Sequence, residues 1–164
     1  MKILTLHCDY IKFKPLKKAL KSVEELPDKE KKEQTAKECL VVLTAVEKGD
    51  NENSVKELVN NIQDITKQID TKNIVLYPYA HLSSNLTSPE IATEILNEAE
   101  KLLKKGKYKI TKAPFGYYKE FELKVKGHPL SELSREIKQE GKKNESKGEK
   151  EIVDWSHAEL VEKM

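Results

Sequence analysis

The stretch that decides the fold is "CLVVLTAV", residues 39–46. It is a continuous apolar run rich in β-branched side chains, and it lacks the alternation of a half-exposed strand. Such a run is typical of a central strand that is covered on both faces. The turn-forming residues "KGDNEN" follow at 48–53 and end the strand. The chain must therefore supply packing layers on both sides of this strand.

Two amphipathic helices are predicted after this strand. Residues 54–70 carry apolar side chains three and four positions apart, with Ser54 as the expected N-cap. Residues 88–105 begin with "SPE", which offers a cap, a first-turn proline and an acid favoured by the helix dipole. Gly106 is expected to close this second helix. Both helices present one apolar stripe, which fits packing against a sheet.

Further strands are predicted around these helices, at residues 2–8, 73–80, 107–112 and 119–126. Pro78 lacks an N–H for the ladder, so the second of them should end there or lie at an edge. Pro129 is expected to open a short helix that turns Leu130, Leu133 and Ile137 inward. Strands thus alternate with helices, and the predicted class is α/β, with a mixed sheet and packed helices.

The strand at 119–126 contains an oddity. Its alternation gives one charged face and one apolar face, and the apolar face consists of Phe121, Leu123 and Val125 with Lys119 at its head. A lysine aligned with the core either extends its ammonium group into solvent from the strand end or has a use inside. The sequence alone leaves both readings open.

Two charged stretches divide the chain. Residues 24–38 are expected to be an exposed loop or a solvated helix. The stretch 139–151 has no apolar side chain and should be a flexible linker, because it buries too little surface to offset its ordering entropy. We therefore predict a domain at 1–138, a linker at 139–151 and the start of a following segment at 152–164.

Composition excludes several classes of protein. The 164 residues carry a net charge of +2, so no overall basic field demands nucleic acid. No apolar run approaches membrane-span length and no secretory leader is recognisable, so we expect a cytoplasmic protein without membrane contact. Cys8 and Cys39 both lie in apolar strand-like runs and should be buried, reduced thiols.

Four loci hold candidate functional residues at strand ends, where α/β proteins tend to bind ligands. They are "YPYAHLSSNL" with His81, "PFGYYK" with Tyr118 and Lys119, "KGHPLSEL" with His128 and Glu132, and "HCDY" with His7 and Asp9. Structural roles are open for each of them. The histidines could simply be hydrogen-bonded to backbone groups, and Glu132 could complement a helix dipole. The tyrosines could be core aromatics with solvated hydroxyls, and Asp9 could cap a loop.

Several kinds of chemistry lack their motifs. The histidines and cysteines do not have metal-ligand spacing, so no metal is expected. No glycine-rich phosphate loop stands in a strand–turn–helix setting, and no GxSxG elbow occurs. Neither cysteine lies in an exposed, electropositive loop, so a covalent protein nucleophile is not expected. No cofactor is predicted.

Taken together, "HCDY", "YPYAHLSS", "APFGYYK" and "KGHPLSELSR" resemble the N-terminal editing domain of archaeal threonyl-tRNA synthetase. The resemblance covers residues 1 to about 138 and is weak over 14–38. It implies a D-aminoacyl-tRNA deacylase-like fold and a homodimer. It also implies hydrolysis of L-serine wrongly esterified to threonine tRNA. Family members continue into a class II catalytic core and an anticodon-binding domain, so the ligase module is expected to be fused or separate and no ligation is expected of this chain.

The resemblance also implies a set of site residues. The matching words make His81, Tyr118, Lys119 and Glu132 the catalytic candidates. The expected substrate-binding residues are Val46, Pro78, Ala80, Phe115, His7 and Asp9. Cys8 stands where a serine is common in the family, which puts little in doubt.

The implied activity agrees with elementary energetics. A synthetase pocket sized for threonine cannot exclude serine, because one methyl group is worth only about 1–3 kcal/mol. A second, hydrolytic site is a remedy, and it must leave no room for the threonine methyl. We expect Lys119 to anchor the ester or water, Glu132 to meet the α-ammonium or Lys119, and a sugar hydroxyl of the tRNA to assist the water.

Two other functions stay open at this stage. One is a D-aminoacyl-tRNA deacylase, and the other is a non-catalytic module for tRNA binding or dimerisation. Contacts to acceptor-stem phosphates are expected from basic residues, with Lys112, Lys126 and Arg135 as candidates.

Overall fold

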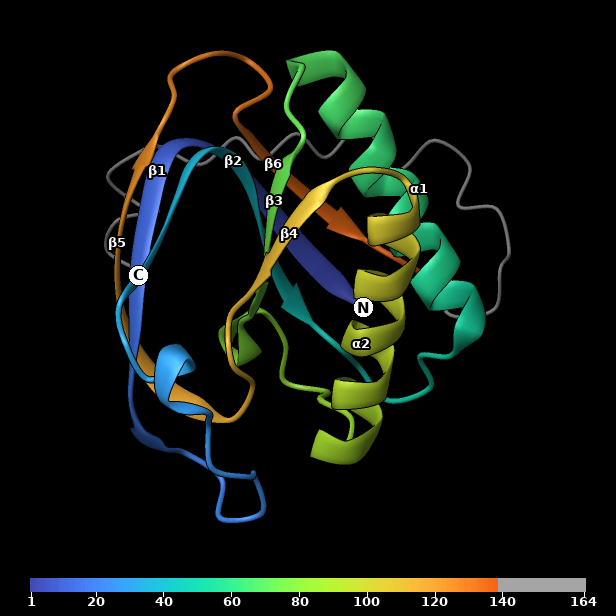
Figure 1. Ribbon diagram of the computed structural model, residues 1–164. Helices are drawn as coiled ribbons and strands as arrows, with labels where there is room; N and C mark the ends of the chain where they lie inside the picture. Colours follow the sequence, from blue (N-terminus) through green and yellow to red (C-terminus); the bar gives the residue numbers. More distant parts are fainter. Residues whose placement is uncertain (139–164) are drawn as a thin grey trace.

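The computed structural model describes residues 1–138 (Figure 1). Its strands are β1 (Lys2–Lys18), β2 (Gln34–Ala45), β3 (Asn73–Pro78), β4 (Lys109–Lys112), β5 (Tyr117–Val125) and β6 (Glu132–Glu136). Its helices are α1 (Glu52–Ile69) and α2 (Pro89–Lys105), and the short 3-10 turns are η1 (Asp28–Glu30) and η2 (Ala80–Leu82). The predicted linker at 139–151 and the segment at 152–164 lie outside the described residues.

The strands form one mixed sheet in the order β4-β3-β2-β1-β5, and β6 also pairs with β1. The ladders β2–β3 and β3–β4 are parallel, whereas β1 is antiparallel to β2, β5 and β6. Because β1 is long, its free side takes two partners in succession. Leu6 lies opposite Glu132 in β6, and Phe13 lies opposite Phe121 in β5.

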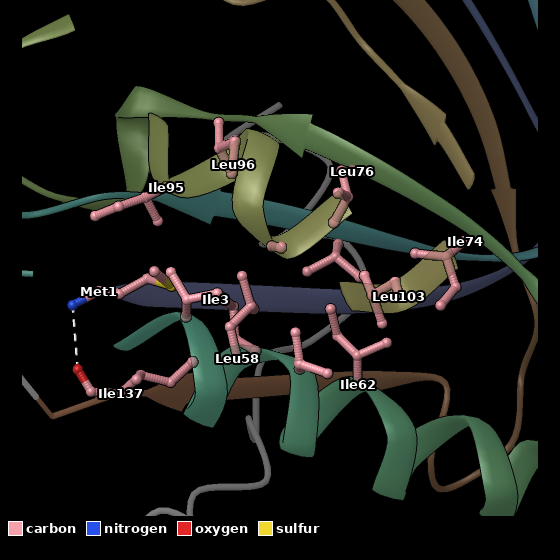
Figure 2. Packing of buried hydrophobic residues seen from close by; sticks show 14 of the residues in the cluster. Met1, Ile3, Leu58, Ile62, Ile74, Leu76, Ile95, Leu96, Leu103 and Ile137 are labelled. Carbon is pink, nitrogen blue, oxygen red and sulfur yellow. Dashed lines mark hydrogen bonds between the residues drawn. The ribbon is translucent and has the colours of Figure 1, made fainter. Parts of the chain in front are cut away.

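The apolar run from Cys39 to Ala45 belongs to β2, the central strand of the sheet, as predicted. Leu40 and Val42 belong to an apolar cluster with α1 and α2, which cover one face of the sheet (Figures 1 and 2). Val41 and Leu43 belong to a second cluster on the opposite face. All four side chains are fully buried. Consecutive strand residues point to opposite faces, so a strand that is buried on both faces carries apolar side chains at successive positions.

The helices begin where local chemistry allows. The second starts after Ser88, which accepts a hydrogen bond from Ile91 N at 3.3 Å, and Gly106 is its C-cap, both as predicted. The first starts earlier than predicted, with Asn51 as its N-cap. Ser54 is the third helical residue, and its Oγ accepts from Asn51 N at 3.1 Å in a capping box.

The predicted short helix after Pro129 is wrong, because these residues lead into β6. Leu133 and Ile137 are buried, as expected, but they are four residues apart, a spacing that suits a helix and a strand equally well. Hydrogen bonds to β1 decide the outcome: His7 N donates to Ser131 O at 2.9 Å and Ile137 N to Met1 O at 2.7 Å.

The first two strands, which pair as a hairpin, are longer than predicted. Strand β1 runs to Lys18, and β2 begins at Gln34 inside the stretch 24–38 that was expected to be loop or helix. Only η1 there is helical among the described residues. The buried Phe13 of β1 pairs with Gln34 at the start of β2. Pairing with β1 therefore extends β2 over residues 34–38, although none of these side chains is fully buried.

Cys8 and Cys39 lie opposite each other in this hairpin and are free and buried, as predicted. Burial raises the pKa of both thiols, that of Cys39 to about 11, so neither is a reactive thiolate near neutral pH. Over residues 1–138, none of the helices has both the length and the apolar character that crossing a bilayer requires.

Candidate functional site

A cavity of about 640 Å³ lies where the parallel strands β2 and β3 end. This volume suits a small organic ligand. Its wall combines the ends of both strands, η2, the first turns of α2 and the turn before β5. Seven of the ten predicted site residues line it: Val46, Pro78, Ala80, His81, Phe115, Tyr118 and Lys119.

Pro78 explains why the cavity opens at this point. The residue ends β3, as its missing N–H predicted, and the chain then leaves the sheet. Tyr79 N still donates to Thr44 O at 2.8 Å, so the exit is held against β2. The following turn, η2, carries Ala80 and His81 to the cavity rim.

Lys119 enters the cavity from the inner face of β5. Its Nζ donates to Pro114 O at 2.9 Å and to Tyr117 O at 3.0 Å, and it lies 5.1 Å from the centroid of the Tyr77 ring. No carboxylate within residues 1–138 forms an ion pair with it. Burial lowers the pKa of Lys119 to about 8. The lysine that heads the apolar face of β5 is therefore a group whose charge changes near neutral pH.

His81 and Tyr118 lie at the rim. The His81 side chain is exposed, and its ring packs edge-on against Tyr79 with centroids 5.2 Å apart. Tyr118 is 56% exposed, and Lys17 Nζ lies 5.8 Å from the centroid of its ring. Both side chains are accessible to a ligand that enters from solvent.

Glu132 does not line the cavity. It lies on β6 opposite Leu6, whereas Lys119 lies opposite Pro15 on the same long strand β1. Nine residues of strand separate the two positions, which is about 30 Å along its contour. A single chain therefore keeps Glu132 apart from the residues around Lys119.

His7 and Asp9 lie at the same end of the sheet as Glu132, also outside the cavity lining. His7 Nδ1 is 2.8 Å from His128 Nε2, and Leu130 N donates to His128 Nδ1 at 3.2 Å. This fixes His128 Nε2 as the donor to His7. Burial is the main cause that lowers the pKa of His7. Asp9 forms an ion pair with Lys126 at 2.5 Å.

The candidate phosphate-binding residues are engaged elsewhere. Lys112 pairs with Glu100 at 3.1 Å, Lys126 with Asp9 and Glu38, and Arg135 donates to Asn61 Oδ1 at 2.7 Å. Across residues 1–138 no group of three or more His, Cys, Asp or Glu side chains has the arrangement of a metal site.

Sequence reasoning missed part of the wall. Thr44, Leu20, Tyr77 and Gly116 also line the cavity. Gly116 has φ +81°, and a Cβ there would lie 2.4 Å from Val23 Cγ1, so this turn accepts glycine alone. The glycine in "PFGYY" was a usable signal for that tight turn. Nothing in the sequence linked residues 19–23 to it.

The fold defines the class of protein. The chain superposes on the solved structure titled c-Myc DNA Unwinding Element Binding Protein with a TM-score of 0.61, over 84% of this chain and 99% of that one. The sequence identity is 12%, so the likeness concerns the fold alone. The fold class predicted from the sequence, α/β with a mixed sheet and packed helices, is confirmed.

Sequence comparison defines the family. A family model described as the archaea-specific editing domain of threonyl-tRNA synthetase matches residues 1–137. The threonine–tRNA ligase of Thermococcus sibiricus is 45% identical over 99% of this chain and 28% of the ligase. That of Methanobrevibacter smithii is 47% identical over 84% of this chain and 23% of the ligase.

The chain therefore belongs to the archaea-specific editing-domain family of threonyl-tRNA synthetase. It spans about a quarter of the length of the curated relatives it matches. The predicted enzyme class, an aminoacyl-tRNA deacylase domain, is confirmed by this membership.

Proposed function

We propose that this domain is a cytoplasmic proofreading hydrolase that removes L-serine from wrongly charged threonine tRNA. The observation that carries the proposal is Lys119, a partly buried amine without a carboxylate partner in the described residues, at a cavity of ligand size. Family membership supports the ester substrate. The terminal adenosine would enter past His81 and Tyr118, and the seryl group would lie toward Val46 and Pro78.

Lys119 is suited to act on the ester carbonyl or on the attacking water. As an ammonium group it has three N–H donors, and the carbonyls of Pro114 and Tyr117 take two of them. The third is left for a ligand. With a pKa of about 8, roughly nine-tenths of the groups are charged at pH 7, so the main role we propose is stabilising the developing oxyanion.

Above its pKa, Lys119 changes from donor to acceptor. The neutral amine retains two N–H bonds for the two carbonyls, and its lone pair becomes available to a water molecule. The pH profile of the chemical step separates the two roles. A rate that falls as pH rises through about 8 supports the ammonium role, and a rate that rises through the same range supports a base.

The walls favour serine over threonine by size. Val46 is buried and Pro78 is rigid, so the pocket has little freedom to admit an extra methyl group. A difference of one methyl group between two substrates changes the ratio of their kcat/KM values by roughly 10–200-fold. A sugar hydroxyl of the tRNA assisting the water would account for a site without a protein nucleophile.

A second copy of the chain would bring Glu132 into the site. The three predicted residues that do not line the cavity lie together: His7 N binds Ser131 O, next to Glu132, and Asp9 follows two positions later. A homodimer in which this end of one copy meets the cavity of the other would explain all three. We propose this arrangement, with Glu132 of the second copy facing the α-ammonium group of the seryl ester.

The rim suits the single-stranded 3′ end of a tRNA. The large hydrophobic side chains that are exposed in the described residues are Leu16, Leu86, Ile91 and Tyr118. Two of them line the cavity, and the others lie on β1 and α2 near its lining residues Ala19 and Pro89. Unpaired bases stack on aromatic side chains, a role open to Tyr118, and pack against the aliphatic ones, while phosphate contacts make the affinity fall with salt.

The deciding experiment times ester loss from L-seryl-, D-seryl- and L-threonyl-tRNA mixed with the 164-residue chain. Preferential loss of L-serine is the expected result. Preferential loss of the D-ester would instead identify a D-aminoacyl-tRNA deacylase. Binding with all three esters intact would identify a non-catalytic tRNA-binding module.

A further inference from the structure

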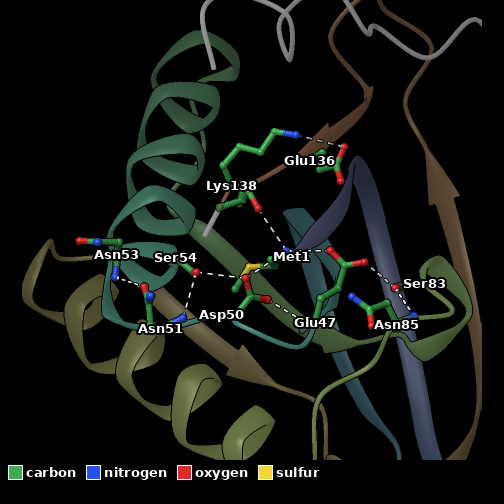
Figure 3. A network of polar contacts seen from close by, with 11 residues as sticks. Met1, Glu47, Asp50, Asn51, Asn53, Ser54, Ser83, Asn85, Glu136 and Lys138 are labelled. Atoms are coloured by element: carbon green, nitrogen blue, oxygen red, sulfur yellow. Dashed lines mark hydrogen bonds and ion pairs between the residues drawn. The ribbon is translucent and has the colours of Figure 1, made fainter. Parts of the chain in front are cut away.

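The α-amino group of Met1 is buried next to Glu47, the residue that follows Val46 of the cavity wall. Met1 has no exposed surface, and its side chain packs among the apolar residues shown in Figure 2. The amino nitrogen donates to Glu47 Oε1 at 2.9 Å, Asp50 Oδ1 at 3.1 Å and Ile137 O at 3.1 Å (Figure 3). All three donors of an ammonium group are thereby used.

This ammonium group neutralises a pair of buried carboxylates. Glu47 and Asp50 are both buried, and no other cation within residues 1–138 forms an ion pair with either. Burial alone would raise the pKa of Glu47, but the hydrogen bonds from Ser83 and from the α-ammonium group outweigh it, so the pKa is lowered. Each oxygen of the Glu47 carboxylate therefore accepts a hydrogen bond, and these bonds favour its charged form.

Glu47 passes this restraint to the cavity. Its Oε2 accepts from Ser83 Oγ at 2.5 Å, and Ser83 Oγ accepts from Asn85 N at 2.9 Å. Lys48 N donates to Asn85 O at 3.1 Å, and Thr87 N to Val46 O at 3.1 Å. Residues 80–87 are thus fastened to residues 46–48, and this segment supplies Ala80, His81, Leu86 and Thr87 to the cavity wall.

We propose that the α-ammonium group of Met1 is a positioning group of the editing site, acting through Glu47 and Ser83 on the segment 80–87. Without its charge, two buried carboxylates would face each other unpaired, and such a pair separates or takes up a proton. Glu47 would then leave Ser83, and the wall that carries His81 would loosen. The activity readout of this proposal rests on the proposed function, whereas its structural readout does not.

The test compares four chains: the parent, a chain extended by Gly-Ser before Met1, Ser83→Ala and Ser84→Ala. The extension moves the charged amine away from Glu47 and Asp50. Ser83→Ala removes the connection and leaves the ion pairs. Ser84→Ala is the matched control, because Ser84 is exposed, adjacent in sequence and absent from the cavity lining. Each is assayed for kcat and KM on seryl-tRNA and for amide hydrogen exchange across residues 80–87 and across β3.

Extension and Ser83→Ala should each lower kcat at least about tenfold, because a small displacement of a reacting group is enough for such a loss. Both should speed exchange in residues 80–87 and leave β3 protected, and Ser84→Ala should match the parent. An extended chain with parental kcat and exchange overturns the proposal. So does Ser83→Ala with parental kcat, which covers the case in which the extended chain fails to fold. A parent chain without hydrolysis removes the proposed function, and the exchange rates in residues 80–87 then decide this inference.

Discussion

Two lysines at opposite ends of β5 behave in opposite ways. Lys119 lies in the cavity, bonded to two backbone carbonyls, and burial lowers its pKa to about 8. Lys126, just after the strand, binds Asp9 first and Glu38 second, and these bonds raise its pKa. One end of the strand therefore carries a lysine that can lose its charge near neutral pH, and the other end carries a lysine whose charged form is stabilised. The difference indicates which end carries chemistry.

Replacing Lys119 should produce the largest effect. Lys119→Met keeps an unbranched side chain of similar length and removes the Nζ that lies over the Tyr77 ring and donates to Pro114 O and Tyr117 O, so the chain should fold and lose deserylation by at least about tenfold. The control variant Lys109→Met should keep kcat within about twofold, because Lys109 is exposed on β4 and absent from the cavity lining. Single-turnover kinetics on seryl-tRNA measure both. Parental rates for Lys119→Met would refute the proposed role of this lysine.

Mixing two inactive variants tests whether the ends of two copies meet. Lys119→Met and Glu132→Gln should each be inactive alone. Random exchange makes half of the dimers mixed, and one of the two sites in each mixed dimer is intact, so about a quarter of parental activity should return. Deacylation by the mixture, after incubation that allows subunit exchange, is the measurement. A mixture as inactive as its components would show that Glu132 does not complete a partner's site.

Truncating the cavity wall should change selectivity more than rate. Val46→Ala opens space beside the substrate, so hydrolysis of threonyl-tRNA should rise about tenfold relative to seryl-tRNA. Val42→Ala is the control, because Val42 is equally buried in the same cluster but does not line the cavity. Both should lose about 1–3 kcal/mol of unfolding free energy. Equal selectivity in the two variants would place the specificity elsewhere.

The pair of His7 and His128 should make the smallest contribution, which is to the free energy of unfolding at acidic pH. The pKa of His7 is lowered from 6.5 by burial, so the folded state favours the neutral ring. The associated stability is complete above pH 6.5 and is lost as pH falls through the folded-state pKa. His7→Gln should therefore flatten the loss of unfolding free energy below pH 6.5. The exposed His81, changed to Gln, should leave that slope as it is in urea titrations at several pH values.

The predictions from sequence succeeded where one local pattern has one structural solution. Ser88 with Pro89 starts a helix, and residues 39–45 lie in a buried strand, because capping and continuous apolarity have few alternatives. They failed where two solutions share a pattern. Leu133 and Ile137 fit a helix or a strand, and ladder bonds to β1 made the choice.

The sequence by itself determined the sheet-and-helix class, the buried central strand and the unusual position of Lys119 on an apolar face. Periodicity and chain chemistry encode these features locally. Tertiary structure alone decided that Glu132, His7 and Asp9 lie apart from Lys119, and that the amino group of Met1 supports the cavity wall through Glu47. Such proximity depends on strand register and on contacts between residues far apart in the chain, which no local pattern specifies.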